Sequence, residues 1–169
     1  GYIFCGYTTT KDCNTIGKDD YSMDYLLVKL SPSGEILWQK TIGGSLNDYS
    51  YNLTLTQDGG YLIVGYALSA DGDLTTNSGQ EDFWVVKLNS SGSIQWQKSF
   101  GGSAFEVAHS VIQTRDGDYV IAGSTESKDG DVLGNHGKRD CWILKLDPLG
   151  SVIWKKCIGG SMNEEAESI

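Results

Sequence analysis

One stretch of about 58 residues is used three times in this chain, and that repetition restricts the fold more than any other feature of the sequence. Near-identical spacing of this kind indicates one supersecondary unit that packs against copies of itself. The aligned blocks read DYLLVKLSPSGEILWQKTIGGS, DFWVVKLNSSGSIQWQKSFGGS and DCWILKLDPLGSVIWKKCIGGS. Each block contains one tryptophan at the same place, and these are Trp38, Trp96 and Trp154.

Each unit resolves into four short strands. In the third copy we expect strands over 105–114, 119–125, 141–146 and 151–158, which are rich in β-branched and aromatic residues. The segments between them carry Gly, Asp, Ser or Pro at turn positions. No stretch keeps a helical period over three turns, so the chain is predicted to be all-β.

Four antiparallel strands repeated every 40–60 residues are typical of a β-propeller blade. The tryptophan on the fourth strand supplies a large apolar surface between neighbouring blades, and the Gly-Gly-Ser after it lets the chain turn sharply. A β-helix has shorter coils and parallel strands, and a sandwich does not repeat its sequence this strictly. We therefore predict a β-propeller segment of about three four-stranded blades.

The copies divide the chain into units at about 1–42, 43–100 and 101–158, and 159–169 matches the first strand of a further blade. The opening residues match a second strand, so the first unit is expected to lack its first strand. Closed propellers have about four to eight blades, which three units do not complete. We expect neighbouring blades from a longer chain or from a second copy that gives six blades, and favour the longer chain.

The pattern D-x-W-V-V-K-L-x-x-x-G-x-I-x-W, with T-x-D-G-G-Y-L-I-V-G after it, resembles propeller repeats of secreted or surface proteins of Bacteroidetes-type bacteria. The part from Lys87 to Trp96 is also similar to the tryptophan-docking motif of quinoprotein propellers. Those enzymes hold pyrroloquinoline quinone and Ca²⁺, but the adjacent-cysteine pair associated with them is missing here. The resemblance implies the fold and an extracellular or cell-surface location, and we do not extend it to redox activity.

Charge and composition restrict the partners. A formal net charge of −9 argues against a nucleic-acid ligand, and no apolar run reaches the roughly 20 residues of a membrane helix. An acidic surface favours metal cations or neutral sugars.

Acidic residues in the long loops are candidate calcium ligands. Asp-x-Asp or Asp-x-Asn spacing recurs there, and it can direct two oxygens at one cation. The alternative is an Asx turn, in which the side chain bonds its own backbone. Ca²⁺ is therefore the candidate cofactor, although the sequence identifies none outright. The residues are Asp12, Asn14, Asp71, Asp73, Asp129 and Asp131.

A second acidic set follows the Gly-Gly-Ser blocks at Asp48, Glu106 and Glu164. These residues are expected at the start of the first strand of each unit, where a ring of carboxylates can bind a cation or an amine. The alternative is a repeated structural hydrogen bond to a turn amide. Asp24, Asp82 and Asp140 are predicted to cap the long loops instead.

Aromatic residues on the same loop face suggest sugar binding. Tyr7 and Tyr66, with Tyr49 and Tyr51, can form stacking surfaces beside Asp and Asn acceptors, although blade packing uses most aromatics in such folds. His109 is a further candidate ligand-binding residue, and it has no Cys or His neighbour at metal-ligand spacing.

These features together predict a non-catalytic extracellular module that binds carbohydrate, peptide or protein through this loop face. One alternative is a quinoprotein-like or glycan-active enzyme, which would need an unrepeated His, Arg or carboxylate cluster supplied by other blades. The other is a structural spacer or assembly subunit.

Overall fold

The computed structural model describes residues 1–9 and 22–169, and all regular structure in that part of the chain is β-strand. The prediction of an all-β chain of antiparallel strands is confirmed. The first sheet contains β1 (Tyr2–Thr8), β2 (Asp24–Leu30) and β3 (Ile36–Ile42). The second contains β4 (Asp48–Leu55), β5 (Tyr61–Ala67), β6 (Asp82–Leu88) and β7 (Ile94–Phe100). The third contains β8 (Glu106–Gln113), β9 (Tyr119–Thr125), β10 (Asp140–Leu146) and β11 (Val152–Ile158).

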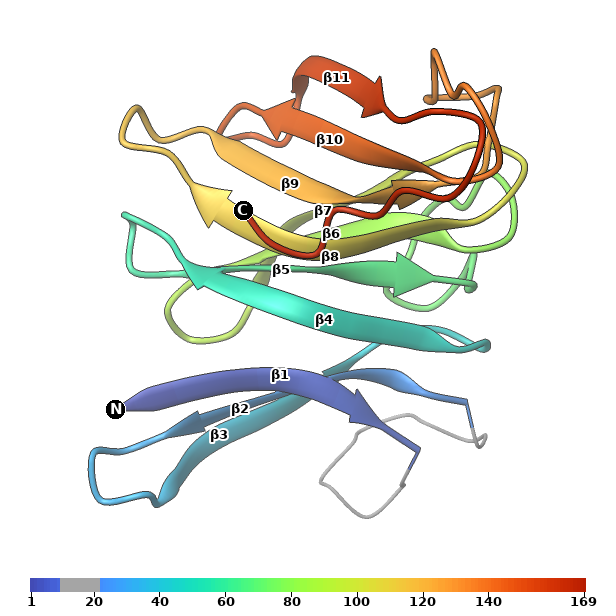
Figure 1. The fold of residues 1–169 in the computed structure, drawn as a ribbon. Coiled ribbons are helices and arrows are strands. Elements are labelled where there is room, and N and C mark those ends of the chain that lie inside the picture. The colour runs from blue at the N-terminus through green and yellow to red at the C-terminus, as the bar shows by residue number, and fades with distance from the viewer. Residues whose placement is uncertain (10–21) are drawn as a thin grey trace.

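The three sheets lie one above another, and each pairs its strands in chain order (Figure 1). Residues 159–169, expected to supply another first strand, form no strand; their one bridge joins Asn163 to Arg139 in parallel. This segment runs back along β8 and β9, where the Ala166 amide donates to the Gly123 carbonyl at 3.4 Å.

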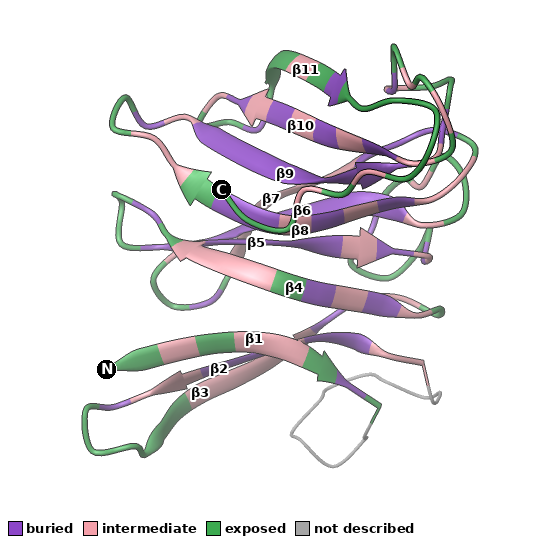
Figure 2. Ribbon diagram, viewed as in Figure 1, coloured by how far each residue is buried: buried purple, intermediate pink, exposed green. Residues whose placement is uncertain are grey.

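The middle sheet is buried on both faces, which explains why its central strands are hydrophobic at nearly every position. Leu62 and Val64 of β5 pack into one core cluster with the third sheet, whereas Tyr61 and Ile63 pack into another with the first sheet. Figure 2 shows the same burial along the whole of β9. Because successive side chains of a strand point to opposite faces of the sheet, one strand contributes residues to both core clusters.

The repeated tryptophans join consecutive sheets. Trp38 of β3 lies against the β6–β7 turn, where a Cβ added to Gly92 would be 3.3 Å from the indole. Trp96 of β7 lies in the same way against Gly150 and donates from Nε1 to the Pro148 carbonyl at 3.2 Å. Trp154 is the equivalent residue of β11; no sheet of the described residues lies against it, and it is 44% exposed.

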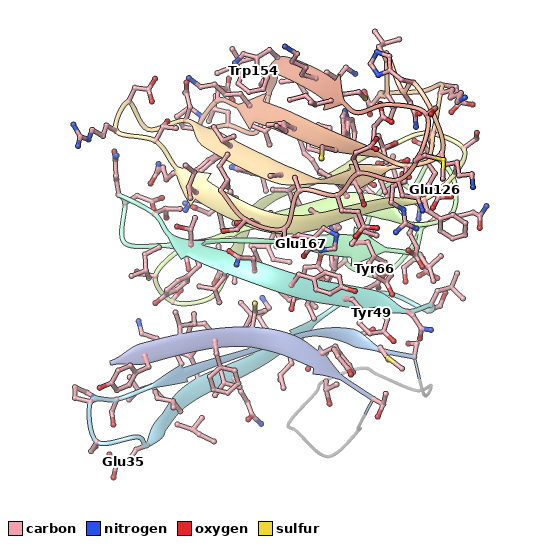
Figure 3. The ribbon with its side chains drawn as sticks, viewed as in Figure 1. Glu35, Tyr49, Tyr66, Glu126, Trp154 and Glu167 are labelled. Carbon is pink, nitrogen blue, oxygen red and sulfur yellow. The ribbon has the colours of Figure 1, made fainter. Side chains whose placement is uncertain are left out.

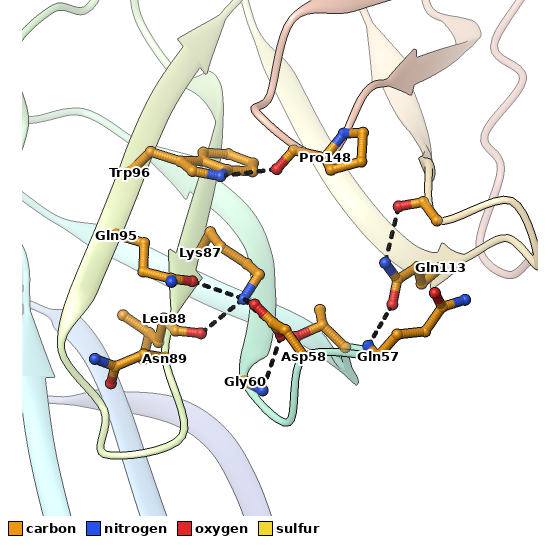
Figure 4. A network of polar contacts seen from close by, with 12 residues as sticks. Gln57, Asp58, Gly60, Lys87, Leu88, Asn89, Gln95, Trp96, Gln113 and Pro148 are labelled. Carbon is orange, nitrogen blue, oxygen red and sulfur yellow. Dashed lines mark hydrogen bonds and ion pairs between the residues drawn. The ribbon is translucent and has the colours of Figure 1, made fainter.

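Ion pairs at the same end of the sheets also repeat, and Figure 4 shows the one formed by Lys87, near Trp96. Lys87, buried in β6, pairs with Asp58 of the β4–β5 turn at 2.8 Å. Lys145 pairs with the equivalent Asp116 of the β8–β9 turn at 3.4 Å and also with Asp118 at 2.9 Å. The Lys87 ammonium holds the pKa of Asp58 at about 2. A backbone amide of the same turn, at Gln57, donates to the Gln113 side chain of the next sheet at 2.7 Å.

Both first strands of the complete sheets carry a β-bulge. The register with the neighbouring strand shifts between Ser50 and Asn52 in β4, and between Ala108 and Ser110 in β8. Tyr51 and His109 therefore have no cross-strand partner, which redirects their side chains relative to a regular strand.

Two remaining sequence features can be placed. Cys141 and Cys157 are free thiols, because Cys157 lies opposite Trp142 and adjacent strand residues point to opposite faces. Within the described residues no helix is long and apolar enough to cross a membrane.

The contact between Trp96 and the Gly150 turn should be measurable. Gly150 has φ +78°, so Gly150→Ala places a side chain on a residue in the left-handed region of backbone conformation. It also brings the new methyl group to 3.0 Å from the Trp96 indole, which is a steric clash. Gly34→Ala is the matched control, since Gly34 has φ +87° and open space around it. We expect Gly150→Ala to lose about 1–2 kcal/mol more unfolding free energy in urea than Gly34→Ala. Equal losses would show that the indole does not hold the turn.

Candidate functional site

The carboxylates that follow the Gly-Gly-Ser turns bind backbone amides of those turns. Asp48 Oδ2 accepts from the Gly44 amide at 2.9 Å, and Glu106 Oε2 accepts from the Gly102 amide at 2.7 Å. Glu164 repeats the arrangement with the Gly160 amide at 2.7 Å. Asp48 and Glu106 are fully buried. This geometry supplies the structural hydrogen bond that was the alternative in the sequence, and a ligand role for these residues stays a prediction.

The loop aspartates bind the same turns. Asp71 and Asp129 accept from the amides of Ser45 and Ser103, each at 2.8 Å, and the Ser103 amide lowers the pKa of Asp129.

The aspartates two residues further along each loop, Asp73 and Asp131, bind different partners. Asp73 accepts from the Gly43 amide at 3.2 Å, whereas Asp131 pairs with Lys155 at 2.8 Å. None of these four aspartates belongs to a group of three potential metal ligands within the described residues. Asp12 and Asn14 lie outside those residues, so calcium binding stays a prediction.

A pair of buried acids lies behind the turn at Gly101. A methyl group at Gly101 would be 2.2 Å from Asp82 Oδ1 and 2.6 Å from Glu106 Oε2, so the two carboxylates enclose this glycine. Asp82 Oδ2 accepts from the Ser78 amide at 2.7 Å, which is the predicted loop cap, but Oδ1 has no hydrogen-bond partner in the described chain. Burial first, and then the charge of Glu106, raise the pKa of Asp82 to about 6.

Four tyrosines form a row across the first and second sheets, near the ends of β1 and β5 and the start of β4. Figure 3 labels two of them, Tyr49 and Tyr66. Successive ring centroids are 4.7 Å apart for Tyr7 and Tyr49, 5.0 Å for Tyr49 and Tyr66, and 6.0 Å for Tyr66 and Tyr51. Tyr7 is 54% exposed and Tyr51 is 49% exposed, so the row is open to solvent. We call these four residues the tyrosine row.

The tyrosine row continues into charged groups. The Tyr51 ring lies 5.4 Å from the His109 ring, and His109 Nδ1 is 4.0 Å from the Glu167 carboxylate. Arg139 pairs with both Glu126 and Glu165 close by, and Glu81 interacts electrostatically with Arg139. We call Glu81, Glu126, Arg139, Glu165 and Glu167 the ionic cluster.

The ionic cluster and burial together shift the acidities of this surface. Burial, Glu81 and the neighbouring tyrosines raise the pKa of both Tyr51 and Tyr66, so these phenols stay protonated and can donate hydrogen bonds. Burial raises the pKa of Glu81, with Arg139 acting in the opposite direction. Pairing with Glu126 and Glu165 raises the pKa of Arg139.

This surface is built from positions at which the copies differ. The tryptophans, turn glycines and turn-bound acids recur from copy to copy, whereas most members of the tyrosine row and the ionic cluster change chemical type at equivalent positions. Conformation shared by all copies depends on shared residues, so the residues that differ between copies are not required by the repeated framework. The equivalent positions are Tyr49, Val107 and Glu165; Tyr51, His109 and Glu167; Met23, Glu81 and Arg139; Tyr7, Tyr66 and Ser124.

The structure brings together Tyr7, Tyr66 and His109 of the residues that the sequence indicated. Asp48 and Glu106, the first residues of β4 and β8, instead direct their carboxylates at the Gly-Gly-Ser turns. Sequence reasoning missed the ionic cluster, because it assigned any unrepeated His, Arg and carboxylate group to other blades. The missed signal was the difference between aligned copies.

Comparison with protein-family models found no match, and comparison with curated proteins found no significant relative. The resemblance to secreted propeller repeats therefore stays a prediction.

The Asp82–Glu106 pair should make stability depend on pH. A carboxyl whose pKa is raised on folding binds its proton more tightly in the native state, so stability falls as pH rises from about 4 to the folded pKa of about 6. Asp82→Asn should flatten this fall in urea unfolding measured from pH 4 to 7. Asp58→Asn, at a carboxylate whose pKa is lowered to about 2, should leave that window unchanged. Because the pKa values of Asp48 and Glu81 are raised as well, part of the fall should remain, and a fall of unchanged size in Asp82→Asn would contradict the assignment.

Proposed function

We propose that the three sheets are blades of a β-propeller and that the protein is a non-catalytic, extracellular or cell-surface module that binds a neutral oligosaccharide on the tyrosine row. The propeller is supported by the docking of Trp38 and Trp96 on the next sheet in each case. It is further supported by inter-sheet bonds at equivalent places, from the Asp48 amide to the Met23 carbonyl and from the Glu106 amide to the Glu81 carbonyl.

The observation that carries the binding proposal is the open row of four rings at positions that the repeat does not fix. Aromatic faces stack on the apolar faces of sugar rings, and phenol and carboxylate oxygens bond sugar hydroxyls. A row of several rings favours an oligosaccharide over a single sugar. The net charge of −9 disfavours anionic glycans.

The ionic cluster also supports the alternative of an enzyme, because His109, Arg139 and several carboxylates lie close together within this segment. Binding remains the better interpretation, since Arg139 is held by two carboxylates. Within the described residues, moreover, no serine, threonine or cysteine is hydrogen-bonded to His109, as an activated nucleophile would be. Incubating bound glycans with the protein and analysing them for cleavage distinguishes the two.

Binding should depend on the exposed rings. On a glycan array, we expect neutral oligosaccharides to bind, and Tyr7→Ala or Tyr51→Ala to weaken the best of them by about tenfold or more, measured by calorimetry. Tyr2→Ala is the control, because Tyr2 is exposed at the opposite end of β1. A silent array, or equal losses in all three variants, would contradict the proposal.

A second candidate function is assembly, favoured by the uncovered Trp154. Trp38 and Trp96 each contact a turn glycine of the next sheet and a tyrosine of one of its strands, with ring centroids 6.0 Å from Tyr61 and 6.2 Å from Tyr119 respectively. The counterparts of that glycine and tyrosine in the first sheet are Gly34 and Tyr2. Gly34 has open space around it and Tyr2 is 66% exposed. The third sheet thus carries the tryptophan side of a contact that joins the other sheets, and the first sheet carries the surface on which such a tryptophan packs. We therefore propose that a second copy docks head to tail.

Sedimentation equilibrium over a range of concentrations tests this docking. We expect reversible association of the wild-type chain, lost in Trp154→Ala and kept in Leu133→Ala, which removes an exposed leucine of a loop. A wild-type chain that stays monomeric at every concentration would overturn the proposal and leave the binding function untouched.

A further inference from the structure

The end of the tyrosine row at His109 carries a second kind of chemistry. The bulge in β8 leaves His109 without a cross-strand partner, and its ring packs on Tyr51. Its Nε2 is buried and makes no hydrogen bond with any described residue. The other ring nitrogen, Nδ1, lies 4.0 Å from the Glu167 carboxylate, and imidazole nitrogens are common ligands of transition metals.

Two carboxylates lie within reach of this imidazole. One ligand atom each of His109, Glu165 and Glu167 lies within 4.8 Å of the others, and no other group of three potential ligands occurs among the described residues. Glu165 and Glu167 are two residues apart in the C-terminal segment. Hydrogen bonds from backbone amides hold this segment in place. The Glu164 amide donates to the Arg139 carbonyl at 2.8 Å, and the Ile169 amide donates to Ser110 Oγ at 3.3 Å.

The surrounding charge favours a cation. The ionic cluster holds four carboxylates and one guanidinium, so it is anionic. Arg139 engages Oε1 of Glu165 and leaves Oε2 of that carboxylate available. Glu167 is 70% exposed, so its side chain is able to close the 4.0 Å separation from His109.

We propose that His109, Glu165 and Glu167 bind a divalent transition-metal ion of the zinc class, with solvent completing the coordination. One nitrogen and two carboxylate ligands suit zinc at bond lengths of about 2.0–2.2 Å. Calcium prefers oxygen ligands alone, so this site differs in chemistry from the aspartate pairs of the loops. The proposal does not rest on saccharide binding, since the metal is detected without a sugar.

Calorimetric titration of the 169-residue chain with ZnCl₂ at neutral pH tests the site. We expect one ion to bind per chain, with affinity reduced by about tenfold or more in His109→Ala and in Glu167→Gln. His136→Ala is the matched control, because His136 is the other histidine of the chain and pairs with Asp140. Circular dichroism shows whether each variant keeps the β fold.

Cobalt substitution separates this site from the thiols. Co²⁺ bound by His109 and the two carboxylates gives visible absorption without the charge-transfer band of a thiolate ligand. The proposal is overturned if zinc does not bind, if His109→Ala binds as tightly as the wild type, or if cobalt shows thiolate ligation. Metal binding without glycan binding would contradict only the saccharide proposal, and the reverse result would contradict only this one.

Discussion

Burial of a sheet on both faces is the constraint on which the rest of this structure depends. A four-stranded sheet with two hydrophobic faces is unstable alone, so each sheet requires a neighbour. The middle sheet satisfies that requirement through two core clusters that use alternate residues of the same strands. The tryptophans and turn glycines then set how the sheets stack, and that stacking brings the start of β4 beside the end of β1.

The repeated part of this fold is well predicted by the sequence. The strands expected in the third copy agree within one residue with their observed bounds, and Asp82 and Asp140 cap the long loops through amides of Ser78 and His136. Such features depend on local backbone preferences and on alternation, which a sequence records directly. The buried positions of Asp48 and Glu106 also follow from a repeated hydrogen bond.

The surface with candidate ligands is harder to predict. Arg139, Glu126 and Glu165 are distant in the sequence, and they meet because the C-terminal segment returns across the third sheet. The bulge that redirects His109 has no sequence signature of its own here. Comparing aligned copies for their differences, rather than their identities, marks most of these positions from the amino-acid sequence alone.

The bulges at Tyr51 and His109 have a consequence for how this fold diversifies. A residue outside the hydrogen-bonded ladder has no opposite neighbour that must match its size or charge. Tyrosine, histidine and glutamate are found at that position in successive copies, on an otherwise constant framework. Duplication followed by change at one unpaired residue per copy thus offers a route from a uniform scaffold to an asymmetric surface.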